Sequence, residues 1–186
     1  MTKPLALGTI VGGVVLFIWG AIYHAALPTA AMVFERFNGE DEVAAAVTAA
    51  APRSGTFFLP WMPEESGEAG MKAAQEKMQH GPFVFASVRL GPSPSLGGQL
   101  AIQFGICLLI ALLATRLLIH SQVASARGRM LFLMAVATAG WAAKNLSYWN
   151  WYAFSTAFTV GELLEVAIGF GLIGLAISRV VPVPRG

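Results

Sequence analysis

Residues Ser155–Val180 read STAFTVGELLEVAIGFGLIGLAISRV. This stretch is long enough to cross a bilayer as a helix, which requires about 20 mostly apolar residues. It nevertheless contains two carboxylates, Glu162 and Glu165, whose spacing of three residues projects both from one helical face. Ionisable groups at membrane depth are costly and are usually paired or functional. The stretch therefore predicts a membrane span that carries a polar site.

The composition of the whole chain agrees with a membrane protein. Of its 186 residues, 56% are hydrophobic and only 12% are charged, and the mean hydropathy is +0.65. A soluble domain normally has about 25% charged residues, so soluble and disordered classes are excluded. The net charge of +2 is small and its basic residues form no single patch, which argues against a nucleic-acid partner. The single cysteine, Cys107, excludes an internal disulfide and a Cys-rich metal centre, and no cofactor is indicated.

Three further stretches are long and apolar enough to span a bilayer. Together with the first they run over Leu5–Leu27, Leu100–Ile119, Met130–Tyr148 and Ser155–Val180. The short turn that starts at Asn150 predicts that the third and fourth helices are antiparallel neighbours. The expected fold class is an all-α integral membrane protein with four transmembrane helices.

Basic residues set the expected orientation, because they concentrate in cytoplasmic segments. Six of them flank the spans on one side: Lys3, Arg116, Arg127, Arg129, Arg179 and Arg185. Both termini are then cytoplasmic. The expected plan is transmembrane helix 1 over residues 1–27, an extracytoplasmic insert over 28–99, helices 2–4 over 100–180 and a cytoplasmic tail over 181–186. Such a multi-pass protein fits the cell membrane, in particular a bacterial inner membrane. A cleaved signal peptide is the alternative for the first stretch, although its apolar run is long for that role.

The insert is predicted to fold as a small α/β cap. Its expected elements are a helix capped by Asn38, a strand over Thr56–Leu59, a helix capped by Ser66 and closed by Gly81-Pro82, and a strand over Phe83–Leu90. A segment of about 70 residues buries little core alone. The cap is therefore either a lid or docking surface, or a packed structure without a ligand.

Small residues at regular spacing predict close helix packing. Gly169, Gly171 and Gly174 match a dinucleotide-binding motif, but no strand precedes them, so the nucleotide interpretation lacks its structural context. Packing is expected instead, here and along two further ladders: Gly8 and Gly12, and Ala135, Ala139, Ala143 and Ser147.

The four predicted spans each place a polar group in the outer half of the membrane. The candidate site contains Glu162, Glu165, Lys144, Asn145, His24 and Gln103. We expect Glu162 to pair with Lys144 and Glu165 to hydrogen-bond with Gln103 or Asn145. A purely structural ion pair that sets helix register is the alternative. A metal is not expected, because His24, Glu162 and Glu165 are only weak candidate ligands and the set is thinner than that of di-metal bundles.

Aromatic residues gather around the third turn. Tyr148, Trp149, Trp151 and Tyr152 are expected to form an interfacial aromatic belt, with ligand stacking as the alternative.

These features favour a small membrane protein that binds a ligand, a lipid or a protein partner through the polar site and the cap over an enzyme. Its expected partners are the lipid bilayer and either a membrane protein of a larger complex or further copies of the chain. The first alternative is a membrane enzyme that acts on a lipid or quinone head group with Glu162 and Glu165 as acid and base. The second is an oligomeric proton or cation transporter.

Overall fold

The computed structural model describes residues 3–61 and 67–182 and is mostly helical. The chain divides into two compact units. The helical unit comprises Met1–Phe34, Pro94–Ser147 and Ser155–Gly186, and the cap unit comprises Glu35–Ser93 and Tyr148–Phe154. The cap unit thus combines residues of the predicted insert with a segment from the third turn.

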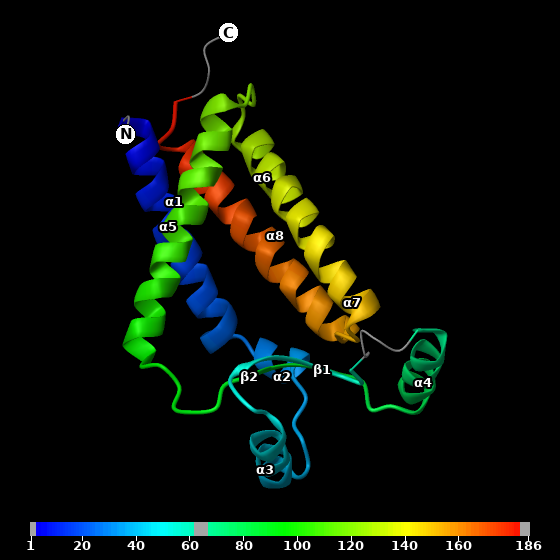
Figure 1. The fold of residues 1–186 in the computed structure, drawn as a ribbon. Coiled ribbons are helices and arrows are strands. Elements are labelled where there is room, and N and C mark those ends of the chain that lie inside the picture. The colour runs from blue at the N-terminus through cyan, green and yellow to red at the C-terminus, as the bar shows by residue number, and fades with distance from the viewer. Residues whose placement is uncertain (1–2, 62–66, 183–186) are drawn as a thin grey trace. The chain divides into compact units, whose positions relative to one another are not determined.

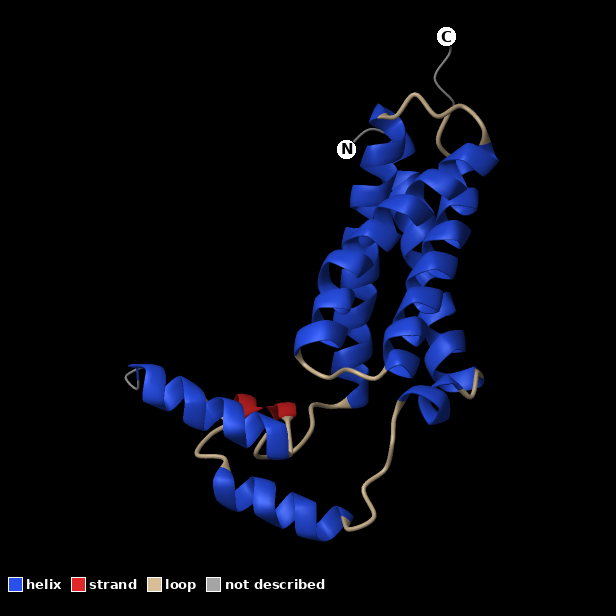
Figure 2. Cartoon of the chain, turned by 90° about the vertical axis from the view of Figure 1, so that its right-hand side faces the viewer, coloured by secondary structure: helices blue, strands red, loops and turns tan. Residues whose placement is uncertain are grey.

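The helical unit is built from four long helical segments (Figures 1 and 2). Its elements are α1 (Lys3–Ala21) with the π-helical turn η1 (Ile22–Ala26), α2 (Thr29–Val33), α5 (Leu96–His120), α6 (Ala126–Trp141) with the π-helical turn η2 (Ala142–Leu146), and α8 (Thr156–Ser178). A short helix, α7 (Ser147–Trp151), follows η2. Ser95, Ser125 and Ser155 cap α5, α6 and α8, because each side chain accepts a backbone N–H of the first turn.

The long helices pack chiefly in the order α5, α1, α8, α6. The α6–α8 contact confirms that the third and fourth predicted helices are neighbours. The buried apolar core lies toward one end of the unit, where α5 ends, α6 begins and α8 ends. It consists of Ala114, Leu118, Leu133, Ile173, Ile177 and Val181.

Three helices of the described chain are long and apolar enough to cross a membrane: Lys3–Ala26, Leu96–His120 and Thr156–Ser178. They correspond to the first, second and fourth predicted spans. The third predicted span is not among them, because α6 ends at Trp141 and the following turn contains the polar residues Lys144 and Asn145. The chain is therefore a membrane-associated protein with three candidate spans.

The glycines of the motif in α8 are sites of close helix approach, as predicted. A Cβ on Gly174 would lie 2.7 Å from the backbone Cα of Met130 in α6. A Cβ on Gly169 would lie 2.9 Å from Cδ1 of Trp19 in α1. Side chains at these positions would force the helices apart.

The two further ladders differ in outcome. Gly8 packs against Thr115, and a Cβ on Gly12 would lie 2.9 Å from that of Ala111, so this ladder brings α1 onto α5. The ladder that starts in α6 is not buried within the described chain, so its packing role stays a prediction. All four of its members are exposed within the chain: Ala135, Ala139, Ala143 and Ser147. The partners of α6 instead reach its other face, where Leu133 and Ala137 are buried.

The cap unit contains the predicted alternation of helices and strands: α3 (Glu40–Ala50), β1 (Gly55–Leu59), α4 (Gly67–His80) and β2 (Val84–Val88). The strands are antiparallel, with Gly55 opposite Val88 and Leu59 opposite Val84. Gly81 ends α4 in the left-handed region, at φ +67°, where glycine carries no steric penalty.

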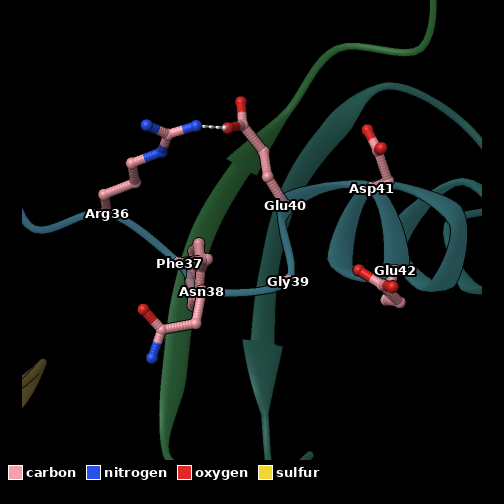
Figure 3. Close-up of a pocket in the computed structure, with 7 residues that line it drawn as sticks. All are labelled: Arg36, Phe37, Asn38, Gly39, Glu40, Asp41 and Glu42. Atoms are coloured by element: carbon pink, nitrogen blue, oxygen red, sulfur yellow. Dashed lines mark hydrogen bonds and ion pairs between the residues drawn. The ribbon is translucent and has the colours of Figure 1, made fainter.

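The predicted caps of α3 and α4 have separate outcomes. The cap prediction for Asn38 is wrong, because Gly39 occupies the N-cap position of α3 and no side chain caps it. The side chain of Asn38 points away from the helix (Figure 3). The predicted cap Ser66 lies outside the described residues.

An aromatic cluster holds the third turn to the hairpin of the cap unit. Its members are Phe58, Phe83 and Phe85 with Tyr148, Tyr152 and Phe154. The rings of Phe85 and Tyr152 have centroids 4.7 Å apart. Two residues of the predicted aromatic belt therefore belong to this cluster, whereas Trp149 and Trp151 are exposed. An interfacial position for these two tryptophans stays a prediction.

Candidate functional site

The centre of the candidate site is an imidazole–carboxylate pair between η1 and α8. Nε2 of His24 lies 3.0 Å from Oε1 of Glu165. The side chain of His24 is 62% exposed and that of Glu165 is 23% exposed. The carboxylate is therefore largely enclosed, while its partner faces outward and can be reached.

Two aromatic residues one turn apart in the first span position this pair. Trp19 Nε1 donates to the carbonyl oxygen of Glu165 at 2.9 Å. The hydroxyl of buried Tyr23 donates to the carbonyl oxygen of Gly161 at 2.8 Å. A Cβ on Gly161 would lie 2.7 Å from Cγ1 of Val33 in α2. The absence of a side chain at Gly161 therefore allows the close contact between α8 and α2. The sequence carries one signal for these roles, the i, i+4 spacing of two aromatic residues with polar tips.

Glu162 lies on α8, three residues before Glu165, and is partly buried. Three charged groups are near enough to act on it electrostatically: Glu165, His24 and Lys144. The structure therefore brings together four of the six predicted site residues. A direct salt bridge between Glu162 and Lys144 stays a prediction.

The two amides of the predicted site bond elsewhere. Gln103 Nε2 donates to Sγ of Cys107 at 3.8 Å, and Asn145 Nδ2 donates to the carbonyl oxygen of Trp141 at 3.3 Å. The expectation that Glu165 bonds with one of them is wrong, because its carboxylate pairs with His24. Each amide instead donates a hydrogen bond to a residue four positions away in the same helical segment.

The two π-helical turns of the described chain carry the cationic side of the site. His24 lies in η1, and Lys144 lies in η2 together with Asn145. A π-helical turn bonds from residue i to i+5, as the Leu27 N–H does to Ile22 at 3.0 Å. Such turns are rare and occur frequently at functional sites.

The described residues contain no group of three or more His, Cys, Asp or Glu side chains arranged to hold a metal. His24, Glu162 and Glu165 thus do not form a three-ligand centre in this structure. The site has two carboxylates and two groups able to carry positive charge. That arrangement suits hydrogen bonding and charge pairing.

An apolar hollow of about 460 Å³ lies beside the positioning residues. Trp19 and Tyr23 form part of its wall, and Gly161, Leu164 and Ile168 of α8 form another part. Both aromatic residues direct their polar atoms to α8 backbone carbonyls. A ligand in this hollow would therefore contact chiefly apolar side chains.

A second polar cluster surrounds Arg129, whose exposure is 0%. Its guanidinium donates to three carbonyl oxygens: Val123 at 3.0 Å, Val181 at 2.8 Å and Pro182 at 2.9 Å. From the sequence, Arg129 is predicted only as a charge that sets orientation. In the structure it joins the α5–α6 connection to the end of α8.

Another hollow, lined by residues 36–42, lies at the start of α3 (Figure 3). Arg36 Nη2 lies 3.3 Å from Oε2 of Glu40, and both side chains are largely exposed. Exposed pairs of this kind contribute little, about 0–1 kcal/mol. We regard this hollow as solvated surface.

Comparisons with protein-family models, with curated proteins and with solved structures give no match for this chain.

Proposed function

We propose that this chain is a multi-pass membrane protein that binds a small amphipathic ligand or lipid at the site of His24, Glu162 and Glu165. The observation that carries the proposal is the enclosed carboxylate of Glu165, paired with an exposed imidazole at 3.0 Å. A ligand with a basic or hydrogen-bond-donating head group can replace or join His24 at this carboxylate. Charge-assisted hydrogen bonds of this kind are among the stronger polar contacts.

Two further features support a binding role. The cationic residues lie on the two π-helical turns of the described chain, where a widened helix turn commonly accompanies function. The apolar hollow beside Trp19 and Tyr23 offers space for the hydrocarbon part of an amphipathic ligand. Binding sites commonly combine an apolar wall with a few convergent polar groups.

The pair of His24 and Glu165 also supports one alternative, a membrane enzyme. Carboxylates and imidazoles are the side chains that most often serve as general acids and bases. Glu162 and Glu165 then act as acid and base on a lipid or quinone head group. Conversion of the bound molecule by the purified protein, lost in Glu165→Gln, would favour the enzyme.

The test is to purify the protein in mild detergent and to quantify bound small molecules by mass spectrometry. Glu165→Gln keeps the shape of the side chain but removes its charge. Because a hydrogen bond to a charged group contributes about 1.5–3 kcal/mol, we expect the affinity for the bound molecule to fall about tenfold or more. Glu68→Gln, which changes an exposed carboxylate in α4, is the matched control and should bind as the parent does.

Two results would contradict the proposal. One is a set of bound molecules that is identical in the parent and in Glu165→Gln. The other is equal loss in Glu165→Gln and Glu68→Gln, which indicates an unspecific effect of charge. A bound protein in place of a small molecule would favour the partner role.

We also propose four spans, with both termini cytoplasmic and the cap unit outside. Single cysteines at Ala49 and Gln122, which are both exposed, report the two sides. In intact cells an impermeant maleimide should label Ala49→Cys and leave Gln122→Cys unlabelled until the membrane is opened. Buried Cys107 should stay unlabelled in both variants. Labelling of Gln122→Cys and not of Ala49→Cys in intact cells would indicate the opposite topology.

A further inference from the structure

A second apolar hollow lies on the same two spans, toward the end that carries the flanking arginines. It has a volume of about 420 Å³ and lies between α1 and α8. Its lining is Val11, Val15, Leu172, Leu175, Ala176, Arg179 and Val180. All of these residues except Arg179 are aliphatic, so the hollow is a hydrocarbon surface with one cation at its border.

Arg179 directly follows α8, one helical turn beyond Leu175. It is exposed, and no carboxylate of the described residues forms an ion pair with it. Because α8 is long and apolar enough to cross a bilayer, a guanidinium at its end can extend to the level of the lipid phosphates. A guanidinium binds phosphate oxygens through two parallel hydrogen bonds.

Arg129, which lies near the same end, has a different environment. Arg129 is sealed from solvent and donates to three carbonyl oxygens. It is therefore committed to internal contacts. Arg179 combines an accessible guanidinium with an adjoining apolar hollow.

We propose that this hollow and Arg179 form a binding site for one anionic phospholipid of the bilayer. The phosphate pairs with Arg179, and one acyl chain lies between Val11 and Val15 of α1 and Leu172 and Leu175 of α8. Charge complementarity favours an anionic head group over a zwitterionic one, whose own cation competes with Arg179. This site is separate from the one around Glu165 and does not depend on the proposed function.

The experiment is native mass spectrometry of the full chain, titrated with phosphatidylglycerol or with phosphatidylcholine that has the same acyl chains. We expect one molecule of phosphatidylglycerol to bind per chain, more tightly than phosphatidylcholine. A basic residue near a membrane surface contributes about 1 kcal/mol to binding anionic lipid, so Arg179→Gln should weaken phosphatidylglycerol binding at least about fivefold. Leu175→Trp should also weaken it, because the larger side chain fills the hollow.

Arg127→Gln is the matched control. It removes the same charge from an exposed residue that does not line this hollow, and it should leave the affinity unchanged. Equal weakening in Arg127→Gln and Arg179→Gln would overturn the proposal in favour of diffuse attraction. Equal affinity for both lipids in the parent would overturn it as well. Glu165→Gln should not change this affinity, so failure here is distinguishable from failure of the proposed function.

Discussion

Arg129→Met is expected to lower the apparent Tm of the detergent-solubilised protein by about 6–12 °C, which corresponds to a loss of at least about 3 kcal/mol at 2–4 °C per kcal/mol. The reason is the three carbonyl oxygens to which the buried guanidinium donates. Hydrogen bonds to a charged group contribute about 1.5–3 kcal/mol each. An apolar side chain of similar length removes the buried charge but cannot remove the backbone acceptors, which are left without their donor.

Two further variants make this prediction specific. Arg129→Lys keeps the charge, but an ammonium lacks the planar fork that reaches several acceptors at once, so we expect intermediate stability. Arg127→Met, at an exposed position two residues away, should change the free energy of unfolding by no more than about 0.5 kcal/mol. A stability of Arg129→Met equal to that of the parent would show that the cluster does not hold the end of α8.

Gly174→Val is expected to reduce the free energy of unfolding by about 2–3 kcal/mol, the range typical of overpacking a tight core. A Cβ at this position would lie 2.7 Å from Cα of Met130 and 3.1 Å from the carbonyl oxygen of Arg129. Both atoms belong to the backbone, so a change of rotamer cannot relieve the clash. The α6–α8 contact must widen, and SDS-induced unfolding in mixed micelles measures the cost.

Gly140→Val is the matched control for this variant. Gly140 lies in α6, and no atom lies within 4 Å of a Cβ built there. We expect a change within about 0.5 kcal/mol. If both valine variants lose the same stability, the loss comes from glycine replacement in a helix and not from the helix contact.

The sequence predicts the long elements well because their causes are local. Apolar length specifies the spans, and the turn at Gly81-Pro82 specifies the end of α4. The third predicted span shows the limit of this reasoning, since Met130–Tyr148 is apolar at its start but polar near Lys144. Apolar content alone does not decide whether such a helix crosses a bilayer.

The candidate site was predictable in part. Glu162 and Glu165 can be identified from the sequence because a carboxylate is energetically costly within an apolar, membrane-spanning stretch. The partner of Glu165 was not predictable, because His24 is 141 residues away and its approach depends on the hydrogen bonds of Trp19 and Tyr23. The burial of Arg129 could not be predicted from the sequence for the same reason, since its acceptors Val181 and Pro182 are 52 and 53 residues away.

The assignment of Tyr148–Phe154 to the cap unit affects any attempt to dissect the protein. The chain passes between the two units at four places and not at two, because the segment between η2 and α8 belongs with the hairpin. Excision of residues 35–93 would strip Tyr148, Tyr152 and Phe154 of the phenylalanines that cover them. A truncated chain would then display a new apolar surface at the start of α8 and would tend to aggregate. The cap is consequently not a removable module, and its boundaries cannot be placed by cutting one continuous piece of sequence.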